Sequence, residues 1–190
     1  MAGRMRADRD VGWSCACLHD NIGTMRRTML PDILRPGLRI VFCGTAAGAK
    51  SAQMGAYYGG PGNQFWPTLH QVGLTRRQLQ PSEYPELLDY GIGLTDVCKT
   101  QAGADHTLAG GGFDTQRLVA LLEQHQPRTL AFNGKKAAEI VLERSVTYGP
   151  QPERVTGARV FVLPSTSGAA RGYWDMRPWR ELAAATALVS

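Results

Sequence analysis

The fold is decided at residues 38–43, which read Leu38-Arg39-Ile40-Val41-Phe42-Cys43. A turn signal, Pro36-Gly37, precedes this apolar run, and Gly44 follows it. Short apolar runs of β-branched and aromatic residues bounded by turn residues are typical of buried strands. The run therefore predicts a fully buried strand, of the kind found in a parallel sheet that is covered on both faces.

Three further strands are expected outward from this one, with helical segments between them. The expected strands are Ile92 to Val97, Thr129 to Phe132 and Arg159 to Leu163. The expected helices are 64–72, 81–90, 114–125, 134–143 and 179–189. Alternating strands and helices predict an α/β fold with three layers, α/β/α, around a central, mostly parallel, four-stranded sheet.

The length of 190 residues indicates one domain. Residues 1–30 lack apolar periodicity, so we expect a flexible N-terminal extension there and a single domain over 31–190. The extension holds Cys15, Cys17 and His19, whose spacing is too tight for an ordinary zinc site. We therefore expect reduced thiols and no bound metal.

The formal net charge is +5, from 21 basic and 16 acidic side chains, and two of these five charges lie in residues 1–30. A small basic excess fits a polyanionic partner without demonstrating one. No apolar run approaches the roughly 20 residues that span a bilayer, and no secretory signal is visible. The expectation is a cytoplasmic protein without a membrane partner.

Ligands of a parallel sheet bind beyond the carboxyl ends of its strands, so the loops at those ends are the candidate sites. The loop after the first strand, Gly44 to Ala52, fails the P-loop spacing because Ala49 stands where the second glycine belongs. The loop after the last expected strand, Leu163 to Arg171, fails the nucleophile-elbow pattern because Ser165 replaces its first glycine. Nucleotide hydrolysis and serine-hydrolase chemistry are both disfavoured.

Two adjacent tyrosines, Tyr57 and Tyr58, precede a glycine-rich turn. A flat ring at a pocket mouth is a platform on which a nucleobase stacks, and a pair of rings packed over a loop is the simpler alternative. The sequence alone leaves both interpretations open.

Several motifs resemble, in order and spacing, the mismatch-specific uracil/thymine-DNA glycosylases of the uracil-DNA glycosylase superfamily. The matching segments are 31–44, Asn63–Trp66, Leu87–Thr95, Asn133–Lys135 and Leu163–Arg171. The resemblance implies an enzyme that flips a damaged pyrimidine out of double-stranded DNA and hydrolyses its glycosidic bond. It implies a monomer that uses no metal or cofactor and associates with the nucleoid by binding DNA.

The resemblance also assigns candidate residues. Those expected to surround the flipped base are Gly44, Thr45, Ala46, Tyr58, Asn133 and Ser165. Those expected to contact DNA are Lys50, Lys135, Ser167, Gly168, Ala169, Ala170 and Arg171. The segment 165–171 is expected to enter the minor groove, fill the vacated stack and read the unpaired guanine.

Two positions depart from the family pattern. The first motif of the family reads Gly-Ile-Asn-Pro-Gly, and its Asn positions the attacking water; Ala46 stands at that place in this chain. At the second position, Ala169 is small where relatives often have a larger wedge. An alanine at position 46 cannot hydrogen-bond a water, so either the enzyme is impaired or the water is held by another residue.

Asp96, at the end of the second expected strand, is the proposed substitute for the missing Asn, and Ser51 is the alternative catalytic candidate. Asp105 and His106 are rivals, and a role for Asp96 as a turn cap or as a partner of Lys99 stays open. The expected activity is monofunctional excision of uracil, chiefly from U·G pairs. Excision of hypoxanthine, xanthine or ethenocytosine is an alternative, as is a damage-binding module that no longer hydrolyses.

Overall fold

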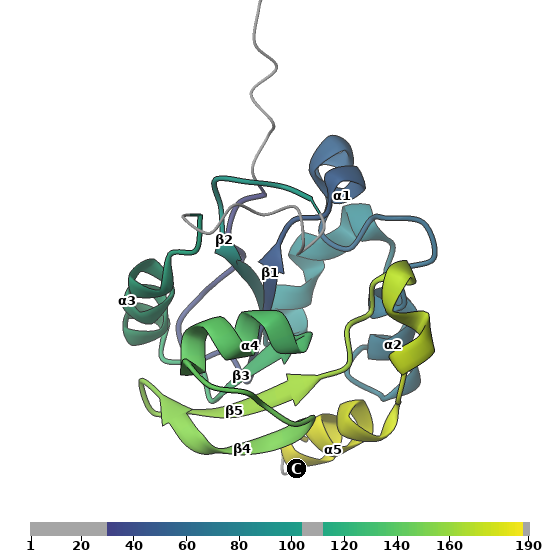
Figure 1. Cartoon of the computed structure of the whole chain (residues 1–190). Coiled ribbons are helices and arrows are strands. Elements are labelled where there is room, and N and C mark those ends of the chain that lie inside the picture. The colour runs from purple at the N-terminus through teal and green to yellow at the C-terminus, as the bar shows by residue number, and fades with distance from the viewer. Residues whose placement is uncertain (1–29, 104–111, 188–190) are drawn as a thin grey trace, which may run out of the picture.

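The computed structural model describes residues 30–103 and 112–187, except the side chains of Arg171 and Tyr173. Its centre is a five-stranded sheet in the order β2-β1-β3-β5-β4, in which only β4 is antiparallel (Figure 1). The elements are β1 (Ile40–Ala46), α1 (Ala49–Met54), α2 (Phe65–Gln71), η1 (Pro81–Tyr90), β2 (Ile92–Cys98), α3 (Thr115–His125), β3 (Thr129–Asn133), α4 (Lys135–Leu142), β4 (Gly149–Val155), β5 (Ala158–Leu163), η3 (Gly168–Tyr173) and α5 (Arg177–Ala185). The expected mostly parallel α/β architecture is confirmed.

The expected number of four strands is wrong, because β4 adds an antiparallel edge strand beside β5. Its sequence contains Pro150 and Pro152 and few apolar residues, so it carries no strand signal. Proline is tolerated at a sheet edge, where one side of the strand has no ladder to complete. The register shift between Pro150 and Arg154 fits this edge position.

Two apolar cores cover the two faces of the sheet. On one face, Phe42 of β1 meets Phe65 of α2 edge-on at 5.3 Å and stacks with Trp179 of α5 at 5.6 Å. On the other face, α3 and α4 pack Leu118, Leu122, Ala137 and Ala138 against the strands. Residues that alternate along β1 therefore contribute to different cores.

The strand order places a topological switch point between β1 and β3. The chain leaves β1 for β2 on one side of it, and β3 and the strands that follow lie on the other side. In open α/β sheets the crevice at such a point, beyond the carboxyl ends of the strands, is where ligands bind. The topology alone therefore directs attention to the ends of β1 and β3.

A short segment before β1 pairs with the outer side of β2. Ile33 and Leu94 exchange two backbone hydrogen bonds, of 2.9 and 3.0 Å, in an antiparallel bridge. Gly93 permits this approach, because a Cβ there would lie 2.6 Å from the Ile33 carbonyl oxygen. The pairing brings Asp32 to the carboxyl end of β2.

Helix α1 was not expected, because the residues after β1 read as a loop, and η1 is a 3₁₀ rather than an α-helix with Pro85 inside it. Within residues 30–103 and 112–187, no helix is long and apolar enough to cross a membrane.

Candidate active site

Three positions that the sequence singled out meet at the switch point. Gly44 on β1 is paired directly with Asp96 on β2, and Asn133 ends the neighbouring strand β3. The alternation of side chains places Asp96 and Asn133 on the face that also carries Phe42 and Ala131, the face covered by α2. The carboxylate and the amide therefore share one side of the sheet, at the edge where a ligand binds.

Asp96 fits into this position because residue 44 is a glycine. The Asp96 side chain is only 4% exposed, and a Cβ at position 44 would lie 2.6 Å from its Oδ1. Any larger residue at position 44 would have to displace the carboxylate. Burial raises the pKa of Asp96, because removal from water disfavours the charged form.

Lys99 opposes this effect. Its Nζ lies 3.3 Å from Asp96 Oδ2, and its charge lowers the pKa of Asp96. The same ammonium lies 3.0 Å from Asp32 Oδ1 and donates to the Tyr57 hydroxyl at 2.6 Å and to the Leu30 carbonyl at 3.0 Å. The alternative in which Asp96 pairs with Lys99 is confirmed, and the pairing holds Oδ2 while Oδ1 lies beside Gly44.

A second cation, Arg117, also contacts Asp32 and Asp96. Arg117 of α3 forms an ion pair with Asp32 through Nη1 and donates from Nη2 to the backbone carbonyl of Asp96. The Thr95 hydroxyl donates to Asp32 Oδ1 at 2.7 Å. Asp32 therefore forms ion pairs with both cations: Lys99, which also contacts the Asp96 carboxylate, and Arg117, which also contacts the Asp96 backbone carbonyl.

The sequence analysis missed Asp32 and Arg117 and considered Lys99 only as a possible partner. One signal was present for Arg117: it lies four residues before Leu121 and next to Leu118, on the flank of the apolar face of its helix. An arginine there either extends its guanidinium to solvent or binds an acceptor at the edge of the core, and here the acceptor is Asp32. Asp32 gave no local signal.

Tyr58 stands over the same edge with unusual backbone geometry. Its φ is 54°, a region that non-glycine residues rarely occupy, and its ring stacks on Phe65 at 3.9 Å. Its hydroxyl is buried and has no hydrogen-bond partner among the described residues. Burial and, next, the charge of Asp96 raise its pKa, while the nearby Asn133 amide acts in the opposite direction. The hydroxyl therefore stays protonated at neutral pH.

Asn133 fixes the segment after β5. Its Nδ2 donates to the Thr166 hydroxyl at 2.8 Å, and its Oδ1 accepts from the Thr166 backbone N–H at 3.0 Å. The Thr166 carbonyl accepts from the Gln64 N–H at 2.9 Å, so the same residue also holds the turn before α2. Thr166, which the sequence analysis passed over, is the junction of three loops.

The segment expected to enter DNA is a short 3₁₀ helix rather than an open loop. Ser165 and Ser167 accept backbone N–H groups from Ser167 and Ala169, each at 3.3 Å, and so begin the η3 turn. Ser167 and Ala169 are exposed, whereas Gly168 and Ala170 are half-buried. Gly168 touches the glycine-rich turn, since a Cβ there would lie 3.1 Å from the Pro61 carbonyl oxygen.

Ser51, the alternative catalytic candidate, has a structural contact. It is buried in α1, and its hydroxyl oxygen accepts the Gly59 N–H at 3.1 Å, which fixes the turn after Tyr58. Ala46 is half-buried at the end of β1, on the same face as Gly44, and is paired with Cys98. The alternation of β1 places Thr45 on the opposite face, away from Asp96.

The candidate DNA-contacting lysines lie near this edge. Lys50 is exposed on α1 and donates to Gln53 at 3.1 Å, and Lys135, at the start of α4, lies over the Tyr148 ring at 4.6 Å. Both are therefore already engaged in weak contacts. The remaining predicted site features lie outside what the structure describes: Cys15, Cys17, His19, Asp105, His106 and the side chain of Arg171.

Metal ligands do not cluster in the described part of the chain: no three His, Cys, Asp or Glu side chains are placed to hold an ion together. The charged groups at the site instead satisfy one another. Near the carboxyl ends of the strands, the arrangement leaves the Tyr58 hydroxyl without a hydrogen-bond partner among the described residues and one carboxylate oxygen of Asp96 beside Gly44, while the Asn133 amide is bound to Thr166.

The fold and the site together define a three-layer α/β domain with a single buried carboxylate at its switch point. Residues 31–188 match the uracil DNA glycosylase superfamily, and the chain belongs to that superfamily. The fold is also similar to the solution NMR structure of a candidate uracil DNA glycosylase from Methanosarcina acetivorans, with a TM-score of 0.61 and 25% sequence identity. The similarity covers 84% of this chain and 96% of that one. The protein is a DNA N-glycosylase, an enzyme that cleaves the bond between a base and its deoxyribose during DNA repair.

Proposed function

We propose that this glycosylase removes uracil from double-stranded DNA, chiefly from U·G pairs, and leaves an abasic site without cutting the strand. The observation that carries the proposal is the Asp96 carboxylate, held at the switch point with Oδ1 beside Gly44 and in the neighbourhood of Tyr58 and Asn133. The motifs shared with the mismatch-specific glycosylases support the preference for a mispaired base. Such a base also costs less to flip than a paired one.

In the proposed reaction, a water oxygen forms a bond to C1′ of the deoxyribose as the bond from C1′ to the base nitrogen breaks. The electron pair of the broken bond leaves with the base, and the water proton passes to Asp96. A carboxylate beside the sugar also offsets the positive charge that develops on it. Asp96 takes over the function that Ala46 cannot perform, from the neighbouring strand and the same face of the sheet.

This role requires Asp96 to be ionised, and its network supports that state. Burial raises the pKa of the Asp96 carboxyl group, and the charge and hydrogen bond of Lys99 lower it toward that of an ionised group. Because Lys99 binds Oδ2, the other oxygen remains for the water. Lys99 is a positioning residue in this proposal, and Asp32 and Arg117 hold it in place.

Tyr58 and Asn133 are the proposed contacts of the flipped base. A buried hydroxyl without a partner costs stability, and a base carbonyl oxygen would satisfy it. Asn133 has both of its polar atoms bound to Thr166, so we propose that it positions the segment after β5 as well as lining the crevice. The half-buried ring of Tyr58, backed by Phe65, is the stacking platform.

Recognition of the unpaired guanine is assigned to the η3 turn. Ser167 and Ala169 are exposed there. The segment is held by the hydrogen bonds between Asn133 and Thr166 and by the contact of Gly168 with the glycine-rich turn. A small residue at position 169 fills the vacated stack only partly. We therefore propose weaker retention of the abasic product than a large wedge would give.

The test is cleavage of labelled duplexes that carry U·G, T·G, U·A or hypoxanthine·T, each followed by alkali. The proposal expects the fastest cleavage at U·G. Faster cleavage at hypoxanthine would indicate that the substrates are deaminated purines. Equal cleavage rates at U·A and U·G would show that the enzyme does not prefer mispaired uracil. Strand cleavage without alkali would contradict direct water attack.

A further inference from the structure

A hollow of about 1090 Å³ lies at the edge of the sheet opposite the candidate active site. It is lined where the strands begin, by Arg39 before β1, Gly91 before β2 and Arg128 before β3. Strand β1 has seven residues, which at about 3.3 Å each separate this edge from the active edge by about 20 Å. The hollow and the candidate active site therefore lie at opposite ends of the strands.

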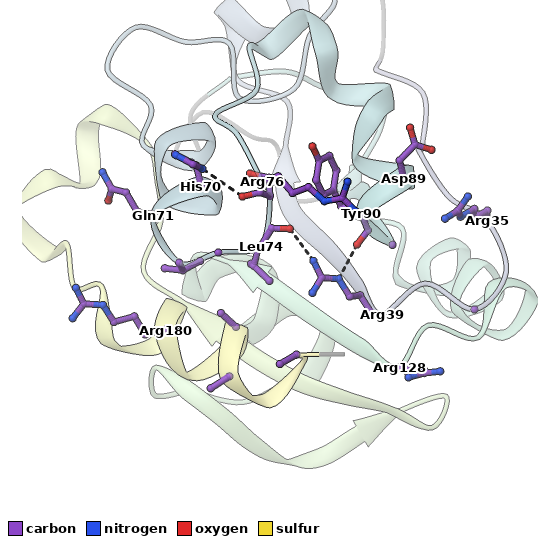
Figure 2. Close-up of a pocket in the computed structure, with 18 residues that line it drawn as sticks. Arg35, Arg39, His70, Gln71, Leu74, Arg76, Asp89, Tyr90, Arg128 and Arg180 are labelled. Atoms are coloured by element: carbon purple, nitrogen blue, oxygen red, sulfur yellow. Dashed lines mark hydrogen bonds between the residues drawn. The ribbon is translucent and has the colours of Figure 1, made fainter. Parts of the chain in front are cut away.

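The described residues that line it are strongly basic: they include five arginines and one carboxylate, Asp89. Arg39 is half-buried and shapes the floor: its Nε donates to the Tyr90 carbonyl at 2.7 Å and its Nη2 to the Leu74 carbonyl at 2.8 Å (Figure 2). The other four arginines, Arg35, Arg76, Arg128 and Arg180, are exposed.

These four differ from the rest of the described arginines. Each of the other arginine side chains that the structure describes binds a carboxylate or a backbone carbonyl. Arg77, Arg117, Arg144 and Arg177 bind carboxylates. Arg39, Arg154 and Arg159 bind backbone carbonyls, and of these three only Arg39 lines the hollow. The four exposed arginines of the hollow make no ion pair or side-chain hydrogen bond to any described residue. Among the arginines whose side chains the structure describes, those without a described partner therefore all line this hollow.

Their arrangement suits an extended anion rather than a small one. Figure 2 shows Arg35 and Arg128 toward one side of the hollow, Arg180 toward the other and Arg76 between them. A single phosphate ion would need guanidinium groups that converge on one point. Spaced guanidinium groups instead match the repeated phosphates of a nucleic-acid backbone, to which arginine binds through paired N–H groups.

We propose that this hollow is a second, sequence-independent DNA site that binds the phosphate backbone of another duplex segment. An enzyme that scans DNA gains from such a site, because it can hold a second segment before releasing the first. The site stands apart from the chemistry at Asp96. If the proposal of a second DNA site is wrong, the proposed excision reaction at Asp96 is therefore unaffected.

The test compares Arg76→Gln/Arg128→Gln with Arg77→Gln/Arg144→Gln, a control that removes the same two charges from arginines outside the hollow. Binding of an undamaged 12-base-pair duplex is measured over a range of salt concentrations, together with the number of duplexes bound at saturation. The wild type and the control should bind two duplexes. The hollow variant should bind one, with a salt slope lower by about 0.9 for each phosphate that the protein no longer neutralises.

Single-turnover excision from a short U·G duplex reports separately on the active site and should be the same in all three proteins. One bound duplex in the wild type, or an equal salt slope in both variants, would overturn the proposal. A hollow variant that loses stability but keeps its salt slope would show instead that the arginines only offset the negative ends of the helices that terminate at this edge.

Discussion

Lys99 and Asp96 form an ion pair of 3.3 Å in which the ammonium contacts Oδ2 and leaves Oδ1 beside Gly44. The carboxylate is nearly inaccessible to solvent, and the lysine itself is only 14% exposed. A buried ion pair contributes little net stability, because desolvation offsets much of the attraction. What the pair does is hold the carboxylate in one orientation and oppose the effect of burial on its pKa, near the carboxyl end of β2.

The change Asp96→Asn should slow excision of uracil from a U·G duplex by about 10²–10⁴-fold, the usual contribution of a general base. The amide keeps the shape of the side chain but cannot accept the water proton. Single-turnover rates measure the effect, and duplex binding should persist. Ser51→Ala tests the alternative candidate: its hydroxyl accepts the Gly59 N–H and supports the turn after Tyr58, so we expect a smaller loss of rate than in the Asp96 variant. If only the Ser51 variant were slower, Ser51 rather than Asp96 would be the catalytic residue.

The change Lys99→Met should move the acid limb of the kcat profile to higher pH. Burial raises the pKa of Asp96 and Lys99 lowers it, so removal of the ammonium raises the pKa further. Because the deprotonated carboxylate is the active form, the rate then rises only at higher pH. Lys99→Arg should restore the position of the limb in part. A uniform loss of rate at every pH, with the midpoint unchanged, would indicate a purely structural lysine.

The change Gly44→Ala should lower kcat by about 10²-fold, the effect of a displacement of roughly 1 Å in a catalytic group. The added Cβ would lie 2.6 Å from Asp96 Oδ1, so the carboxylate must move. Gly48→Ala is the control, because the nearest atom to a Cβ there is the Ser51 hydroxyl oxygen at 3.9 Å. Steady-state kinetics on a U·G duplex compare the two variants. Equal rates would mean that the position of Oδ1 does not matter.

The sequence was sufficient to predict the parts of the molecule that rest on local pattern. The apolar run at residues 38–43 predicts β1, and the sequence also places Asp96 correctly near the carboxyl end of β2. Strand β4 escaped prediction because an edge strand needs no apolar alternation and tolerates proline. The helix α1 escaped it because its short, glycine-flanked sequence reads equally well as a loop.

The contacts of Asp96 could not be predicted from the sequence for a different reason. Its network joins residues far apart in the chain: the contact from Thr95 to Asp32 spans 63 residues, and that from Arg117 to Asp32 spans 85. The pairing of Ile33 with Leu94 helps to bring these residues together. No local pattern encodes such a contact, whereas Lys99, three residues after Asp96, was within reach of sequence reasoning.

The change Tyr58→Phe should raise stability and lower activity together. The Tyr58 hydroxyl is buried without a partner among the described residues, so its removal should stabilise the free protein by about 1–3 kcal/mol, the usual cost of such a group. The aromatic stack on Phe65 is retained. Excision should slow, because the flipped base loses a protonated donor at this edge. Urea unfolding and single-turnover cleavage of a U·G duplex measure the two effects on the same preparation. Reduced stability would mean that the hydroxyl already has a partner in the free enzyme, and an unchanged rate would remove it from the contacts of the base.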